Sequence, residues 1–149
     1  MKGEVPDGEH LVPIGLADIK RTGEDVTIVA HSKMLHVALQ AADKLAAEHE
    51  VDAEVVDLRS LRPLDLDTYV ASVKKTNRAV VLEEGWPTAG IGAQVVDDIQ
   101  REAFDYLDAP VARVSGLDVP MHYARTLEKL IVPDADAVVN AVKHVCYLD

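Results

Sequence analysis

Short apolar runs alternate with helical apolar stripes along most of the chain. Runs of strand length that are apolar or rich in β-branched residues predict strands at residues 16–21, 26–30, 53–58, 79–82 and 111–114. The runs 26–30 and 79–82 are almost wholly apolar, which is typical of strands that are covered on both faces. Residues 16–21 alternate only weakly, so we expect them at an edge of the sheet.

The segments between these strands predict helices. The first carries apolar residues at helical spacing from Leu35 to Ala46, and Ser32 stands at its expected N-cap, where a hydroxyl can accept a backbone N–H. Further helices are predicted at about 67–76, from Gly90 onward, and at about 134–147, with Asp134 or Asp136 near the positive end of the last. Alternation of strands and helices predicts a three-layer α/β/α fold with a mostly parallel sheet.

The beginning of the chain has a different composition. Residues 1–13 combine Gly3, Pro6, Gly8 and Pro13 with polar residues, which is typical of a linker. No second linker follows, so we expect a linker at residues 1–13 and one domain at residues 14–149. A linker in this position suggests that another segment precedes the domain.

Composition and charge narrow the partners that we expect. The 149 residues carry a formal net charge of −11, which argues against nucleic acid and favours encounter with a basic protein. No apolar run approaches the roughly 20 residues that a spanning helix needs, so we expect no membrane passage. The single cysteine, Cys146, suits a reducing compartment and is expected to pack in a helix rather than to react.

The segment from Glu83 to Ala93 has the greatest potential for chemistry. It reads as a strand end, a glycine-rich loop and the first turn of a helix, and its three glycines do not fit the dinucleotide or P-loop spacing. An anion at the helix N-terminus remains an alternative, but no lysine or serine stands where a phosphate site would need one, so tight turns and close backbone approach are the preferred explanation. Trp86 in this loop suggests either an interface anchor or a half-buried lid over the core.

The titratable residues do not define a reaction by themselves. Alternation sends one of Glu83 and Glu84 inward, and a buried carboxylate there would need a partner, for which the candidates are Arg59, Arg62 and Arg113. The six histidines show no metal-ligand spacing. The neighbours His31 and Ser32 end a strand, where capping and packing are the simpler explanation than a catalytic pair.

Five segments in order carry a family resemblance. They are Gly23–Val29, Val56–Asp65, the loop Glu83–Ala93, Phe104–Pro110 with Arg113 and Val114, and Asp118–Ala124 with Leu127 and Glu128. Together they resemble the carboxyl-terminal domain of thiamine diphosphate-dependent 2-oxoacid dehydrogenase beta subunits, the transketolase C-terminal-like domain. The Gly85-Trp86-Pro87 form of the loop is most similar to the pyruvate dehydrogenase branch of that family.

The resemblance implies a five-stranded, mostly parallel sheet whose first strand is an antiparallel edge. It implies a parent enzyme that oxidatively decarboxylates pyruvate and transfers acetyl to lipoyl groups, with thiamine diphosphate and magnesium bound outside this domain. It also implies a mitochondrial matrix or bacterial cytoplasmic location. We therefore expect this chain to be non-catalytic and to contribute no cofactor or metal ligand.

Assembly and docking are the roles that the resemblance assigns to this domain. The implied partners are the alpha subunit and second beta subunit of a heterotetramer, and the basic peripheral subunit-binding domain of the dihydrolipoyl acetyltransferase. The docking role falls on Asp108 and on Asp149 with its terminal carboxylate, while Trp86 and Pro87 are candidates for a subunit interface. Two alternatives stay open: a branched-chain 2-oxoacid or acetoin dehydrogenase beta subunit, and a stand-alone α/β domain that binds an anion or nucleotide.

Overall fold

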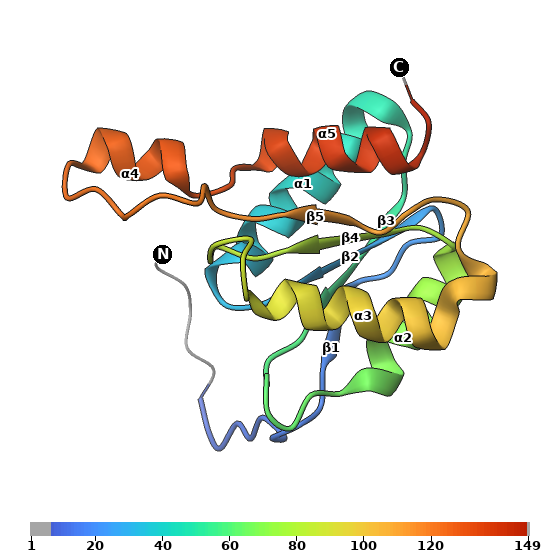
Figure 1. The fold of residues 1–149 in the computed structure, drawn as a ribbon. Coiled ribbons are helices and arrows are strands. Elements are labelled where there is room, and N and C mark those ends of the chain that lie inside the picture. The colour runs from blue at the N-terminus through green and yellow to red at the C-terminus, as the bar shows by residue number, and fades with distance from the viewer. Residues whose placement is uncertain (1–6, 149) are drawn as a thin grey trace.

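One sheet lies between two layers of helices in the computed structural model, which describes residues 7–148 (Figure 1). The strands are β1 (Asp18–Arg21), β2 (Val26–Ala30), β3 (Ala53–Asp57), β4 (Ala79–Leu82) and β5 (Ala112–Val114). The helices are α1 (Lys33–His49), α2 (Leu66–Thr76), α3 (Ile91–Ala103), α4 (Arg125–Ile131) and α5 (Ala135–Val145), with a 3-10 turn η1 (Phe104–Tyr106).

The sheet has the predicted topology. Its spatial order is β1-β3-β2-β4-β5, with β1 antiparallel to β3 and every other pair parallel. The mostly parallel sheet with an antiparallel edge strand is therefore confirmed. The predicted bounds of β2 and β4 are reproduced, whereas β1 begins two residues later than the weak alternation from residue 16 suggested.

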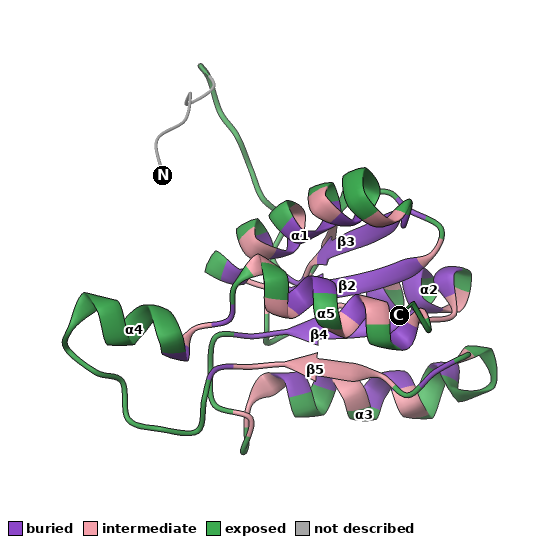
Figure 2. Cartoon of the chain, turned by 90° about the horizontal axis from the view of Figure 1, so that it is seen from above, coloured by how far each residue is buried: buried purple, intermediate pink, exposed green. Residues whose placement is uncertain are grey.

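Each face of the sheet has its own apolar core. Helices α1 and α5 cover one face, and α2 and α3 cover the other (Figures 1 and 2). The central strand β2 is buried along its whole length because helices pack on both of its faces. Side chains alternate between the two cores: Ile28 packs toward α1 and α5, and Val29 toward α2 and α3.

The helix N-termini are capped unequally. Asp65 and Asp134 accept backbone N–H groups from Thr68 and Ala137 at 3.3 and 2.9 Å, respectively. Ser32 occupies the N-cap position of α1 as predicted, but the predicted hydroxyl cap is wrong. Its backbone takes a φ of 54°, and its side chain makes no capping hydrogen bond.

Residues 115–131, here called the arm, leave the body of the domain beyond the end of the sheet and include α4 (Figures 1 and 2). Sequence patterns did not predict α4, because its leucines face solvent and form no stripe against the core. The arm exposes six large apolar side chains: Leu117, Val119, Met121, Tyr123, Leu127 and Leu130.

The described part of the predicted linker has no helix or strand. Residues 7–13 are exposed, while residues 1–6 of the predicted linker lie outside the described residues. The division at residue 13 stays a prediction. No helix among residues 7–148 combines the length and apolar character needed to cross a membrane.

Candidate functional site

The candidate residues lie at opposite edges of the sheet. Because β2 to β5 run in parallel, residues that follow them gather at the carboxyl edge and residues that precede them gather at the amino edge. Trp86 and Pro87 follow β4 at the carboxyl edge, and Asp108 precedes β5 at the amino edge. Docking and interface candidates are thus not one site.

Asp108 is held in place by three neighbours at the amino edge. Its backbone N–H donates to the Asn77 carbonyl at 2.9 Å, and its own carbonyl accepts the Tyr147 hydroxyl at 3.0 Å. The Arg78 guanidinium lies 3.3 Å from the Asp108 carboxylate, whose side chain is still 56% exposed. A partner can therefore reach a carboxylate whose backbone is fixed from both sides.

The other docking candidate, Asp149, lies outside the described residues. Tyr147 nevertheless brings the end of the described chain to the Asp108 loop through its hydroxyl. The described residues before Asp149 thus run beside Asp108.

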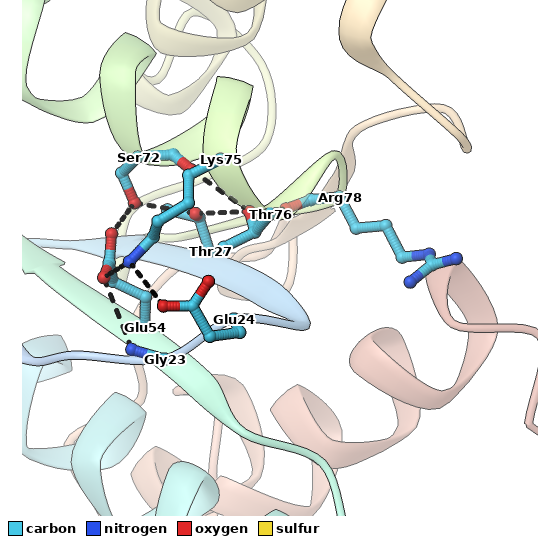
Figure 3. A network of polar contacts seen from close by, with 8 residues as sticks. All are labelled: Gly23, Glu24, Thr27, Glu54, Ser72, Lys75, Thr76 and Arg78. Atoms are coloured by element: carbon cyan, nitrogen blue, oxygen red, sulfur yellow. Dashed lines mark hydrogen bonds and ion pairs between the residues drawn. The ribbon is translucent and has the colours of Figure 1, made fainter.

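A buried polar network fixes the end of α2, two residues before Arg78 (Figure 3). Glu54, on β3, is almost fully buried and accepts hydrogen bonds from Ser72 at 2.5 Å and from the Lys75 ammonium. The hydrogen bond to Glu54 raises the pKa of Lys75.

Thr27 extends the same network into β2. Its hydroxyl lies 2.7 Å from those of Ser72 and Thr76, and Thr76 also donates to the Arg78 carbonyl at 3.1 Å. Each polar group that these strands and α2 bury therefore has a partner, as buried groups require. The network positions Arg78, whose side chain extends away from it (Figure 3).

A largely apolar pocket adjoins Asp108. A pocket of about 330 Å³ lies beside Asp108 and is lined by Phe104, Leu107, Ala109 and Pro110. Phe104, in η1, is 67% exposed. This combination suits a partner that offers a cationic group next to an apolar side chain.

Cys146 lies at the same end of α5 and is partly buried against the core. Burial raises the pKa of the Cys146 thiol, so the nucleophilic thiolate is scarce near neutral pH. This agrees with the predicted packing role.

At the carboxyl edge, Glu83 is buried and Glu84 is exposed, as alternation predicted. Of the three candidate partners, Arg113 is the one that pairs: its guanidinium donates to Glu83 Oε1 at 2.7 Å. The other oxygen, Oε2, accepts the Gly92 N–H at 3.1 Å in the first turn of α3. The helix N-terminus that the anion-binding alternative required is thus occupied by the chain's own carboxylate.

The glycines of this loop make room for that carboxylate. A Cβ atom at Gly92 would lie 2.5 Å from Glu83 Oε1, and one at Gly90 would lie 2.6 Å from Glu83 Oε2 and from the Trp86 carbonyl oxygen. Both separations are closer than real Cβ contacts. The expectation of close backbone approach is therefore correct for these two glycines.

Trp86 connects this loop to the arm. The side chain is 54% exposed, and its indole N–H donates to the Val119 carbonyl at 3.0 Å. The Pro87 carbonyl accepts from Arg113 at 2.8 Å, which joins the loop to the Glu83 cluster. Trp86 is not among the described side chains that pack against either apolar core, and the part of Trp86 and Pro87 in a subunit interface stays a prediction.

The point between β2 and β4 is where open parallel sheets commonly bind ligands. Here Leu58, Ile91 and Val95 fill it, and the space left beside His31 is too small for a water molecule. Within residues 7–148, no three His, Cys, Asp or Glu side chains gather in a way that could hold a metal ion.

Sequence reasoning missed Arg78 and Tyr147 as neighbours of Asp108. Arg78 stands just before a buried strand and Tyr147 near the chain end, and nothing in their local patterns links them to residue 108. Of these three residues, the sequence pointed only to Asp108, through the family motif.

Comparisons with known proteins agree on one family. A profile described as Transketolase, C-terminal domain matches residues 15–138. The chain is 53% identical over 147 residues to the mitochondrial pyruvate dehydrogenase E1 component subunit beta-2 of Oryza sativa subsp. japonica, covering 99% of this chain and 39% of that protein. It is 51% identical over 144 residues to the pyruvate dehydrogenase E1 component subunit beta of Rickettsia felis, covering 97% and 44%.

A solved structure is similar as well. A split-gene transketolase, described as an inactive beta4 tetramer, superposes with a TM-score of 0.79 at 35% identity. The match covers 98% of this chain and 46% of that one. The chain thus spans less than half the length of these relatives.

Proposed function

The chain belongs to the transketolase C-terminal domain family, and from this premise we propose that it is the carboxyl-terminal domain of a pyruvate dehydrogenase beta subunit. The observation that carries the proposal is about 50% identity, over nearly the whole chain, to plant mitochondrial and bacterial proteins of that name. The parent enzyme oxidatively decarboxylates pyruvate and passes the acetyl group to a lipoyl group. The relatives' names favour pyruvate over a branched-chain 2-oxoacid or acetoin, and a mitochondrial matrix or bacterial cytoplasm.

The domain itself serves in assembly and docking and is not catalytic. Its partners are the alpha subunit, a second beta subunit and the basic peripheral subunit-binding domain of the acetyltransferase. The excess of negative charge supports a basic partner, because complementary charge speeds encounter. The accessible Asp108 carboxylate beside an apolar pocket supports a specific contact with that partner.

Thiamine diphosphate, the cofactor of the parent, does not fit the residues at the carboxyl edge of this sheet. A diphosphate at the α3 N-terminus would meet the buried Glu83 carboxylate, which already takes the Gly92 N–H. The negative charges of the diphosphate and of the carboxylate would repel each other there. The cofactor and its magnesium ion belong to the rest of the enzyme, and no chemical step is assigned to this domain.

The arm supports a role in assembly. Monomers seldom expose large contiguous apolar patches, and exposed ones commonly mark protein contacts. Six large apolar side chains of the arm face solvent, and the similar transketolase structure is described as a tetramer.

Binding to a purified subunit-binding domain of a dihydrolipoyl acetyltransferase tests the docking proposal. We expect Asp108→Ala to weaken binding, measured by isothermal titration calorimetry at low salt, by at least about tenfold, or about 1.4 kcal/mol. Raising the salt concentration should weaken binding of the original chain more than binding of the variant, because the variant lacks the charge that salt screens.

Asp105→Ala is the matched control for this experiment. Asp105 is an exposed carboxylate in η1 and forms no ion pair among the described residues, so its loss changes net charge equally. Equal affinities of Asp108→Ala and the original chain, or equal losses in both variants, would refute the assignment of Asp108.

A further inference from the structure

A cavity of about 520 Å³ lies between the first turns of α1, helix α4 of the arm and the segment that joins α4 to α5. Small-molecule sites typically have volumes of about 300–1,000 Å³. Its walls combine cationic side chains with the apolar side chains of Val37, Val132 and Pro133. The volume and lining therefore suit an organic molecule that carries negative charge.

Three of the lining residues are cations without an ion pair. Among residues 7–148, most lysine and arginine side chains pair with a carboxylate within 4.0 Å. The exceptions are Lys33, Arg62, Lys74, Arg125, Lys129 and Lys143, and three of them, Lys33, Arg125 and Lys129, line this one cavity. Unpaired positive charge is thus concentrated at one place on a protein of net charge −11.

Two carboxylates also line the cavity, and they do not cancel this charge. Asp134 is engaged as the N-cap of α5, where it accepts the Ala137 N–H at 2.9 Å. Glu128 forms no ion pair with the three cations in the described structure. Three cations against two carboxylates leave the lining net positive.

The cations approach from two elements. Arg125 and Lys129 are four residues apart on α4, so they share one face of that helix. Lys33 is the first residue of α1, a helix that has no acidic residue in its first turn and no side-chain cap. A cation at the positive end of a helix dipole is unfavourable, and an anion in the cavity removes that cost.

We propose that this cavity binds a small phosphorylated molecule. The phosphoryl group binds among Lys33 of α1 and the Arg125–Lys129 pair of α4, because a guanidinium and two ammonium groups can all donate hydrogen bonds to its oxygens. The organic part of the ligand contacts Val37, Val132 and Pro133. The site is separate from the Asp108 docking region and shares α4 with the arm, but Leu127 and Leu130, which the assembly role uses, do not line it.

Titration calorimetry with inorganic phosphate and with glycerol 3-phosphate tests this site on the full chain, with sodium chloride at equal ionic strength as the blank. We expect saturable binding of glycerol 3-phosphate and a matching rise in melting temperature. Lys129→Gln and Lys33→Gln should each weaken binding at least tenfold. Tighter binding of glycerol 3-phosphate than of inorganic phosphate supports the proposal, whereas equal affinities contradict the contacts assigned to the organic part.

Lys143→Gln is the matched control, because Lys143 on α5 is an unpaired cation that does not line the cavity. It should leave the affinity unchanged. Amide shifts in NMR spectra should cluster at the cavity lining and not at the Gly85–Gly92 loop. Absence of saturable binding at millimolar concentration, or an equal loss in the Lys143 variant, overturns the proposal.

Discussion

Glu83 does for α3 what a bound anion does for many α/β proteins. Its carboxylate accepts a first-turn N–H through one oxygen and binds Arg113 through the other, while Gly90 and Gly92 leave space for it. Because Arg113 also holds the Pro87 carbonyl, this single side chain organises the strand end, the loop and the helix start together. The glycine-rich loop and helix start that suggested an anion site in the sequence therefore already pair with a carboxylate of the same chain.

Glu83→Gln should destabilise the domain. Removing one partner of a buried ion pair costs about 3–5 kcal/mol, and the side chain of Arg113 is 25% exposed, so we expect a loss nearer the lower end. Urea denaturation followed by circular dichroism measures the free energy of unfolding. The control is Glu84→Gln, an exposed neighbour whose loss should stay within about 0.5 kcal/mol. Equal stability of the two variants would contradict the structural role of Glu83.

At the scale of elements, the start of α2 illustrates how one side chain joins two segments. Asp65 accepts the Thr68 N–H and hydroxyl as the N-cap, and also the Ala17 N–H at 2.9 Å just before β1. Burial alone would raise the pKa of Asp65, but these hydrogen bonds outweigh burial and lower it from the ordinary value of 3.8. The ionised form is therefore the one that stabilises the fold.

Asp65→Ala should lower stability by about 1–2 kcal/mol at neutral pH, as the loss of a helix cap does. A lowered pKa in the folded state means that this contribution is complete above the unfolded value of 3.8 and disappears as the pH falls through the lower folded value. The stability difference between the original chain and the variant should thus vanish in that acidic range. Asp67→Ala, in the same helical turn but exposed, is the control that should show a smaller loss of stability at neutral pH.

Helices and strands that bury an apolar face could be predicted from the sequence. An element that buries no such face could not be predicted. The bounds of β2 and β4 follow from apolar runs such as Val26–Ala30. Such a run is buried along its whole length in a strand that helices cover on both faces. The arm helix α4 was missed because Leu127 and Leu130 face solvent and give no periodic signal against the core. The Glu83 partner was narrowed to three arginines, yet only the pairing of β4 with β5 brings Arg113 beside it.

The candidate sites were less predictable than the fold for a related reason. Asp108 came from a motif, but its neighbours Arg78 and Tyr147 come from segments 30 or more residues away in sequence, joined by the fold alone. Likewise, Lys33 and Lys129 carry no shared pattern, and only the folded chain brings them to the lining of one cavity. Sites assembled across elements require the packed structure.

On the scale of the whole molecule, the two surfaces proposed for partner contact are separated, and one is polar while the other is apolar. The amino edge offers Asp108 with a small pocket, whereas the arm beyond the carboxyl edge offers solvent-facing leucines and Tyr123. Charged surfaces chiefly steer encounter, while apolar ones supply the free energy of stable association. This division fits a domain that docks one partner and assembles with another through different faces.

The arm should therefore mediate self-association of the chain. Burying one leucine contributes about 1.5–3 kcal/mol, so placing charges at two leucines in both copies of a symmetric contact should weaken association at least about a hundredfold, or about 2.7 kcal/mol. We expect the original chain to sediment as a dimer or larger species at micromolar concentration, and Leu127→Asp with Leu130→Asp as a monomer. The melting temperature of the double variant at low concentration should not fall, because both side chains are exposed within one chain.

Phe104→Asp places the same charge on an exposed apolar residue at the amino edge and should leave the sedimenting mass unchanged. A monomeric original chain at these concentrations, or a Phe104 variant that dissociates equally, would exclude the arm as the self-association surface.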